Sequence, residues 1–197
     1  MKYYIEITLT GSPAFPLYHL WSKLYTQLHL ALAVNKNTYH KINVGISFPE
    51  YRFDAEKGIG FLGTKLRLFA EEESILQKID LQKWFVRLMD CIHISPVCTV
   101  PQKEITGYVT FSRKRVKTNA ERLARRHMKR HTELSFKEAV KRYQKIITTS
   151  PLPFIQLESL SNGHPFKLFV EKKPATDKSI KPFTTYGLSS EATVPEF

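Results

Sequence analysis

The pattern of apolar and polar positions predicts alternating strands and helices over the first hundred residues. Tyr3–Leu9 alternates and is rich in β-branched and aromatic residues, which favours a strand. From Pro16, apolar residues recur three and four positions apart as far as Leu32, which predicts a helix that ends near Asn35. The following segments are predicted as a strand at Lys41–Phe48, a loop at Tyr51–Gly60, a strand at Lys65–Ala70, a helix from Glu71 to about Asp90 with a break near Asp80, and a strand at Cys91–Val100. The order βαββαβ is that of a ferredoxin-like unit.

The second half of the chain has a different organisation. "YVTFSRKRVK" predicts an exposed strand that ends in basic residues, and "FIQLES" and "FKLFVEKK" predict two strands around the turn "SNGHP". Ser135 with Glu138 predicts a capping box for a helix, and "FTTYGLS" is interpreted as a last strand. We therefore expect an α+β protein with a ferredoxin-like domain at 1–101 and a C-terminal domain at 102–197.

The stretch "TNAERLARRHMKRH" predicts an arginine-rich helix over about 119–131. Thr118 and Glu121 have the spacing of a capping box. On a helix, one continuous stripe of bases is formed by Arg122, Arg125, Arg126, Lys129 and Arg130. Small and apolar residues and two histidines, among them His131, fall on the opposite side. Glu121 is the only acid in the stretch, so the five cations are expected to be unpaired and to need an anionic partner.

The excess positive charge is concentrated around this helix. The chain has a formal net charge of +12, and residues 113–145 hold 13 Lys and Arg against 3 Asp and Glu. Such a block is typical of a phosphate-backbone or anionic-membrane surface. A membrane-surface helix would carry large apolar residues opposite its bases, whereas this one carries Ala, Met and His, so nucleic acid is favoured. A solvated charged face without a partner is the remaining alternative.

The motifs of several enzyme classes are missing from the sequence. It holds no P-loop, no dinucleotide-binding glycine pattern and no acidic cluster of the kind that a two-metal nuclease uses. Cys91 and Cys98 have only His93 between them, which makes no zinc site. We expect no metal and no cofactor. No apolar run is long enough to span a membrane and the N-terminus lacks a signal-peptide core, so a cytoplasmic protein is expected.

Metal-free chemistry on bound RNA would use the ribose 2′-OH as nucleophile and would need a side chain to move its proton. Histidine suits this role at neutral pH. Of the seven histidines, His29 lies at the edge of the apolar stripe of the first helix, beside Tyr18, Ser22 and Tyr25. An edge histidine can face a cleft, or it can be an ordinary residue at the rim of the core.

Several stretches in the same order resemble one family along essentially the whole chain. They are "QLHLAL" around His29, "VGISFP", "SRKRVKTNAERLARRHMKRH", "LPFIQLESLSNGHPFKLF", "TYGLS" and the terminal "VPEF". By these stretches the sequence resembles the subtype I-F CRISPR-associated endoribonucleases, the Csy-four family of repeat-cleaving Cas-six relatives.

The resemblance implies a function as well as a fold. Members of this family bind the stem-loop of each CRISPR repeat and cut once at the base of the stem, without metal, through the 2′-OH. The product carries a cyclic phosphate, stays bound and joins the type I-F surveillance complex. The expected partners are therefore the repeat RNA and the subunits of that complex.

The resemblance also assigns roles to residues of this chain. His29 matches the family's proton-transfer histidine, Ser159 the serine that positions the 2′-OH, and Tyr186 a tyrosine that orients the site. Arg113 matches a base-reading arginine, and Phe166 an aromatic residue that stacks at the base of the stem. The helix in the RNA groove is matched by Arg122, Arg125, Arg126, Lys129, Arg130 and His131.

Two positions depart from the family pattern. Arg115 stands where the family has Gln, and Arg pairs with guanine where Gln prefers adenine, so the stem that is read is expected to differ. Ala120 replaces a proline after the capping Asn, which affects helix initiation more than chemistry. Two other functions stay open: an RNA-hairpin-binding subunit in which His29 is unused, and a DNA-binding regulator that uses the basic helix.

Overall fold

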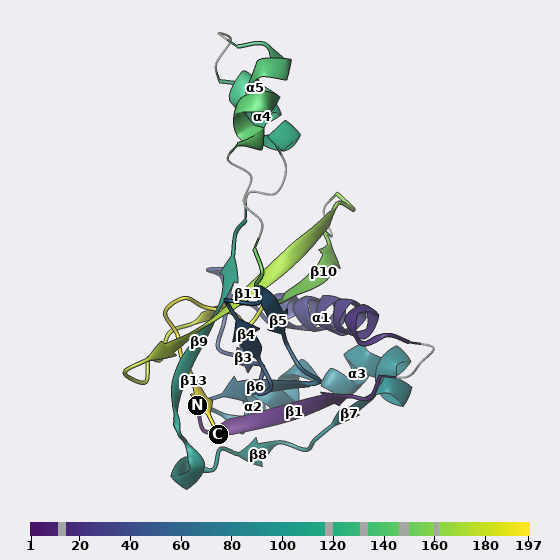
Figure 1. The fold of residues 1–197 in the computed structure, drawn as a ribbon. Coiled ribbons are helices and arrows are strands. Elements are labelled where there is room, and N and C mark those ends of the chain that lie inside the picture. Colours follow the sequence, from purple (N-terminus) through teal and green to yellow (C-terminus); the bar gives the residue numbers. More distant parts are fainter. Residues whose placement is uncertain (12–14, 117–119, 131–133, 146–149, 160–161) are drawn as a thin grey trace. The chain divides into compact units, whose positions relative to one another are not determined.

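The computed structural model describes residues 1–11, 15–116, 120–130, 134–145, 150–159 and 162–197. The chain divides into two compact units, one formed by Met1–Arg113 with Leu152–Phe197 and the other by Lys114–Pro151 (Figure 1). In chain order the elements are β1 (Tyr3–Leu9), α1 (Leu17–Val34), β2 (Lys41–Ile42), β3 (Gly45–Ser47), β4 (Arg52–Asp54), β5 (Ile59–Phe61), β6 (Lys65–Ala70), α2 (Glu73–Ile79), α3 (Leu81–Phe85), the 3₁₀ helix η1 (Val86–Cys91), β7 (Ile92–Ile94), β8 (Cys98–Thr99), the 3₁₀ helix η2 (Gln102–Glu104), β9 (Gly107–Lys114), α4 (Ala120–Met128), α5 (Phe136–Gln144), β10 (Phe154–Glu158), β11 (Pro165–Ala175), β12 (Phe183–Thr184) and β13 (Val194–Glu196).

The first sheet has the strand order β3-β6-β1-β7, and β8 also pairs with β1. All of these pairs are antiparallel, and β1 pairs with β6 from Tyr3 opposite Ala70 to Thr8 opposite Lys65. Helix α1 buries one leucine per turn, at positions 20, 24, 28 and 32, in the hydrophobic core that also holds the inner residues of β1 and β6. This spacing of four residues is the apolar stripe of an amphipathic helix, which explains why the segment is helical.

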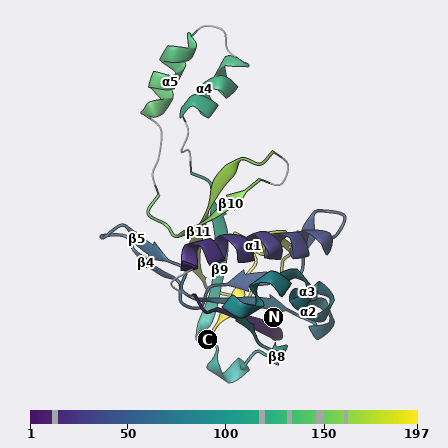
Figure 2. The same cartoon turned by 90° about the vertical axis from the view of Figure 1, so that its right-hand side faces the viewer.

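The second sheet has the order β10-β11-β9-β13. Its strand β10 runs beside α1, where the Ser22 hydroxyl donates a hydrogen bond of 2.5 Å to the Gln156 carbonyl (Figure 2). The short strand β12 pairs with β2 and so links the C-terminal segment to the N-terminal half of the chain. Helix α1 therefore contacts elements from both halves of the sequence.

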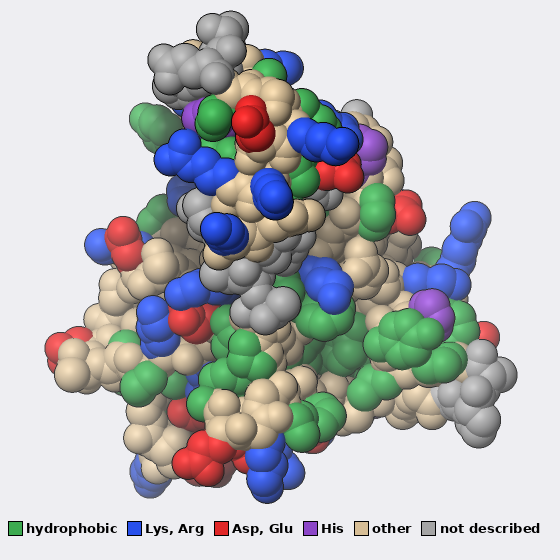
Figure 3. All heavy atoms as spheres, turned by 45° about the horizontal axis from the view of Figure 1, so that its top comes forward, with side chains coloured by type: hydrophobic (Ala, Val, Ile, Leu, Met, Phe, Trp, Pro, Cys, Tyr) green, Lys and Arg blue, Asp and Glu red, His purple; other side chains and the backbone are tan. Residues whose placement is uncertain are grey.

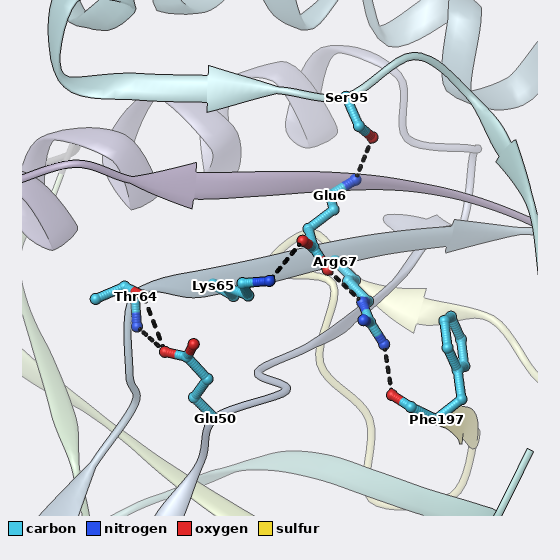
Figure 4. A network of polar contacts seen from close by, with 7 residues as sticks. All are labelled: Glu6, Glu50, Thr64, Lys65, Arg67, Ser95 and Phe197. Carbon is cyan, nitrogen blue, oxygen red and sulfur yellow. Dashed lines mark hydrogen bonds and ion pairs between the residues drawn. The ribbon is translucent and has the colours of Figure 1, made fainter. Parts of the chain in front are cut away.

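A network of polar contacts links β1, β6 and the C-terminal residue Phe197 (Figure 4). Glu6 on β1 accepts hydrogen bonds from Lys65 at 3.0 Å and from Arg67 at 2.7 Å, both on β6. Arg67 also donates to the Phe197 carbonyl at 2.8 Å, and its guanidinium lies 4.1 Å from the centroid of the Phe197 ring. The last residues of the chain are thereby held against β6. Beside the network, Glu50 accepts hydrogen bonds from the backbone and hydroxyl of Thr64.

The second unit is a pair of helices, α4 and α5. Ala120 and Ala124 of α4 and Ala139 of α5 are buried, and the Tyr143 hydroxyl lies 3.3 Å from Nδ1 of His127. The predicted capping box of Ser135 and Glu138 is confirmed, with both reciprocal hydrogen bonds present. The helix predicted over about 119–131 is observed as α4 over Ala120–Met128; Thr118, Asn119 and His131 lie outside the described residues.

The predicted α+β class is confirmed, and several element predictions need correction. The segment Tyr51–Gly60, predicted as a loop, instead forms most of an exposed antiparallel hairpin of β4 and β5. The predicted strands at Lys41–Phe48 and Cys91–Val100 are each split in two. In "FTTYGLS" only Phe183–Thr184 is a strand, and a turn follows. The expected break at Asp80 is confirmed: this residue has a left-handed backbone with φ of 49° between α2 and α3.

The predicted boundary at residue 101 differs from the observed division into units, and the two predicted domains stay a prediction. In the part of the chain that the structure describes, no helix is both long and apolar enough to cross a membrane.

Candidate active site

A tight turn after β12 forms one wall of the site. The backbone N–H of Gly187 donates to the Thr184 carbonyl at 2.8 Å, and the Thr184 backbone N–H and hydroxyl both donate to the Leu188 carbonyl. Gly187 has φ of 68°, and a Cβ atom there would lie 2.4 Å from a side-chain carbon of Ile46. Only glycine fits this position, because any side chain would be strained and would also clash with β3. The turn therefore fixes the backbone positions of Thr185 and Tyr186.

His29 of α1 is held by this turn. Its ring lies parallel to the Tyr186 ring, with centroids 3.9 Å apart and an angle of 2° between the planes. Its Nδ1 atom is 2.9 Å from the Thr185 carbonyl oxygen. The contact spans most of the chain and brings together two predicted site residues from distant stretches of the sequence, His29 and Tyr186.

The hydrogen bond to Thr185 fixes which ring nitrogen of His29 can accept a proton. A backbone carbonyl can only accept, so Nδ1 must carry the hydrogen that is donated. In neutral imidazole the other nitrogen, Nε2, then has a free lone pair. Burial is the main cause that lowers the pKa of His29 below its ordinary value; the nearby Arg113 charge lowers it further, and the Thr185 hydrogen bond partly offsets both. The neutral, proton-accepting form is therefore favoured at neutral pH.

Arg113 connects the stacked pair of His29 and Tyr186 to a partly buried aromatic residue, Phe166. This arginine lies near the end of β9 and is exposed. Its guanidinium lies 5.0 Å from the centroid of the Phe166 ring and 5.8 Å from that of Tyr186, which is within the range of a cation–π contact. The structure thus places four of the predicted site residues, His29, Tyr186, Arg113 and Phe166, in one connected group on α1, β9, β11 and the turn after β12.

Tyr25, to which the sequence analysis assigned no role, holds the backbone of this group in place through a buried hydrogen bond. Tyr25 is one turn before His29 on α1 and is fully buried. Its hydroxyl donates a hydrogen bond of 2.8 Å to the Tyr186 carbonyl. A buried tyrosine hydroxyl needs such a partner, and here the partner is the backbone of the residue that stacks on His29. The position of Tyr25 beside His29 on the helix was the available signal.

Ser159 lies directly after β10, at the start of the turn that leads into β11. Its backbone N–H donates to the His164 carbonyl at 2.9 Å, and its own carbonyl accepts from Gly163 at 2.7 Å. Gly163 has φ of 65°, which closes the turn. The structure therefore gives Ser159 a defined backbone position; its predicted role toward a 2′-OH stays a prediction.

The predicted basic residues belong to the second unit, apart from Arg113. The opposite side of α4 packs on α5, and the exposed basic residues are Arg122, Arg125, Arg126, Lys129 and Arg130. Lys and Arg side chains gather over this unit in Figure 3. The expectation that all five are unpaired is wrong: Arg125 forms an ion pair of 3.0 Å with Glu121, one turn earlier. Arg115 is exposed, and His131 lies outside the described residues.

Comparison with known proteins gives matches over the full chain. Residues 4–197 match the family described as "CRISPR-associated protein (Cas_Csy4)". The chain is 35% identical over 199 residues to the "CRISPR-associated endonuclease Cas6/Csy4" of Pseudomonas aeruginosa (strain UCBPP-PA14), with 100% of both chains covered. It is 33% identical over 199 residues to the protein of the same name from Escherichia coli (strain UTI89 / UPEC), again with 100% of both covered.

Similarity to solved structures was also found. One described as "CRISPR associated protein Cas6" covers 99% of this chain and 98% of its own, with 10% identity and a TM-score of 0.37. A TM-score at this level supports no argument about function or fold.

Proposed function

This chain belongs to the Csy4 family of CRISPR-associated endonucleases, and we propose that it binds the stem-loop of a CRISPR repeat and cuts the precursor RNA once, at the base of the stem. The observation that carries the chemistry is the state of His29. A neutral imidazole with its Nδ1 hydrogen committed to Thr185 presents Nε2 as a proton acceptor. A ribose hydroxyl is the proton donor that RNA itself brings to such a group.

In the proposed reaction the 2′-oxygen attacks the adjacent phosphorus while its proton moves to Nε2 of His29. The bond from phosphorus to the 5′-oxygen of the next nucleotide breaks, and that oxygen takes up a proton from solvent. The His29 imidazolium then releases its proton to solvent, so there is no net uptake or release of protons. The products are a 2′,3′-cyclic phosphate and a 5′-hydroxyl, so no water is consumed in the step. No metal is required in this scheme, since proton transfer and positioning supply the catalysis.

The other site residues act on position and recognition. Tyr186 holds the His29 ring in its plane, and Ser159 orients the 2′-OH. Phe166 stacks under the last base pair, and Arg113, with Arg115, reads base edges. The phosphates of the stem are bound by Arg122, Arg125, Arg126, Lys129, Arg130 and His131. The product stays bound and enters the type I-F surveillance complex with its other subunits.

The fold supports this proposal in one further respect. In the order β3-β6-β1-β7, the connection from β1 to β3 contains α1 and that from β6 to β7 contains α2 and α3. This is the arrangement expected of the ferredoxin-like domain that we propose for 1–101. The RNA-binding domain proposed for 102–197 contains the basic helix α4.

The test uses a repeat hairpin with a single 2′-deoxy sugar before the scissile phosphate. This RNA should bind normally and stay uncut, and chelator should leave cleavage of the all-ribose hairpin unchanged. His29→Ala should lose about 10²–10⁴ in the single-turnover rate at nearly constant affinity, because a proton-transfer group acts in the transition state. His93→Ala, an exposed histidine on β7, is the matched control.

Cleavage of the deoxy substrate would overturn the proposed chemistry, since it would require an external nucleophile. Full activity of His29→Ala would remove His29 from the mechanism. Tight hairpin binding without any cleavage by the native protein would instead favour the second candidate, a non-catalytic RNA-hairpin-binding subunit.

A further inference from the structure

An open groove with a volume of about 850 Å³ runs along α1 on the side where α3, η1 and the β10–β11 hairpin pack around it. Ser22 and Thr26 of α1 line one wall, and Trp84 and Arg87 lie on the other. The hydrogen bond from Ser22 to the Gln156 carbonyl ties α1 to β10 within this lining. None of the roles proposed above uses the groove.

One end of the groove reaches the candidate catalytic residues. Thr26 is three positions before His29, so the two side chains share a face of α1. On the opposite wall Glu158 lines the groove, and the next residue is Ser159. A strand that passes between His29 and Ser159 would thus meet the groove within one helical turn.

The lining chemistry is that of a site for single-stranded nucleic acid. Three exposed cations, Lys23, Lys83 and Arg87, border the groove, and Glu158 is the one acid among its described lining residues. Trp84 is partly exposed within it and offers a flat aromatic surface. Proteins bind unpaired strands by this combination, with cations along the backbone and aromatic rings under the bases. A purely apolar protein segment would leave the three cations without a counter-charge.

We propose that this groove binds the unpaired RNA immediately downstream of the cut. The inference rests on the proposed function. The strand that crosses the catalytic residues is paired upstream, in the stem, and unpaired beyond the scissile phosphate. The groove is where that unpaired continuation would lie, with Trp84 stacking on a base and Lys83 and Arg87 contacting phosphates.

The experiment compares three uncut hairpins that carry the 2′-deoxy sugar: one without a tail, one with a short unpaired downstream tail, and one with an upstream tail of equal length. The downstream tail should tighten binding to the native protein, and the upstream tail should not. Lys83→Ala with Arg87→Ala should abolish that gain and lower the salt slope of the tailed RNA by about 1.4, since each neutralised single-strand phosphate contributes roughly 0.7. Affinity for the tailless hairpin should not change.

Two further variants test whether the position of the charges matters and whether Trp84 stacks on a base. Lys36→Ala with Lys103→Ala removes two exposed cations outside the groove and should keep the full gain from the tail. Trp84→Ala should weaken binding of the tailed RNA alone by about fivefold or more, the lower range for removal of one base–aromatic stack.

The outcomes also distinguish this inference from the proposed function. If the tailless hairpin binds and the all-ribose hairpin with the downstream tail is cut, but that tail adds nothing to the affinity, the groove does not bind RNA and only this inference fails. A gain from the upstream tail, or a gain that survives removal of Lys83 and Arg87, overturns it as well. If no hairpin binds or is cut, the proposed function itself has failed.

Discussion

The imidazole ring of His29 lies flat on the phenol ring of Tyr186, 3.9 Å between centroids, although the two residues stand near opposite ends of the chain. Stacking, together with the Thr185 hydrogen bond, leaves the imidazole little freedom to rotate. The orientation of Nε2 is therefore set by the protein and not by the arriving RNA. Such preorganisation is what proton transfer between fixed partners requires.

The pH dependence of cleavage should report the lowered pKa of His29. Burial and the Arg113 charge disfavour the imidazolium, so the active neutral form should persist below the ordinary value of 6.5. The single-turnover rate is expected to be flat near neutrality and to fall in acid with an apparent pKa below 6.5. Arg113→Gln removes one of the causes and should shift that acid limb to higher pH, with the His29 pKa followed by NMR titration.

The lowered pKa of His29 also predicts how the stability of the folded protein depends on pH. Because the folded protein binds the His29 proton less tightly than the unfolded chain does, this residue's contribution to the unfolding free energy should fall as pH drops through 6.5. For the rate profile, the contradicting outcome is an acid limb of the cleavage rate that lies at the same pH in Arg113→Gln and in the native protein. It would show that the charge of Arg113 does not affect the pKa of His29.

Tyr25→Phe should loosen the turn that carries Tyr186. The change leaves the Tyr186 carbonyl without its buried donor, and an unsatisfied buried acceptor costs about 1–3 kcal/mol. We expect a lower denaturation midpoint and slower cleavage with little change in hairpin affinity. Tyr39→Phe, at a tyrosine that is 83% exposed, should stay within about 0.5 kcal/mol of the native protein. Native cleavage by a destabilised Tyr25→Phe would confine this hydroxyl to a structural role.

Arg113→Ala should relax sequence discrimination. Removing a bidentate contact to a base costs about 1–3 kcal/mol at one base pair and spares stems that already carry a mismatch there. The measurement is the dissociation constant for a matched stem and for each single-pair variant at the base of the stem. Equal weakening of all stems would reduce Arg113 to a phosphate contact. Arg52→Ala, on the exposed strand β4, is the control.

Binding should weaken steeply with salt if the α4 stripe contacts phosphates. Arg125→Ala with Arg126→Ala should reduce the log–log salt slope by about 0.7–0.9 for each phosphate that is no longer neutralised. Arg125 must exchange its pair with Glu121 for a phosphate, so its share of the affinity should be the smaller one. Lys137→Ala with Lys141→Ala removes the same charge from α5 in the same unit, and an equal effect there would deny the stripe a special role.

The sequence was most informative where periodicity reflects burial. The strands Tyr3–Leu9 and Lys65–Ala70 have the predicted bounds, and α1 begins and ends within one residue of its predicted bounds. Each of these elements presents a regular apolar face to one core. The β4–β5 hairpin was missed since it has little buried surface; its turn is organised by Asp54, whose carboxylate accepts from the backbone of Glu56 and Lys57. Local polar chemistry of this kind leaves no hydrophobic period.

The candidate site was partly accessible for the same reason. The edge position of His29 could be read from its helix, and the resemblance supplied Tyr186, Arg113 and Phe166. Their mutual contacts could not be predicted, because a carbonyl such as that of Thr185 has no sequence signature. It reaches the histidine only through the turn that Gly187 permits.

The chain leaves the first unit after Arg113 and returns to it at Leu152, so the helical pair α4–α5 is an insertion between two strands of one sheet, β9 and β10. Among the described residues, the hydrophobic cluster around His29's helix draws only on the flanking segments. Substitutions on α4 should therefore leave the packing around α1 and His29 undisturbed. Under the proposed function, the helices that contact the repeat RNA could therefore change in sequence while the residues proposed for cleavage stay the same.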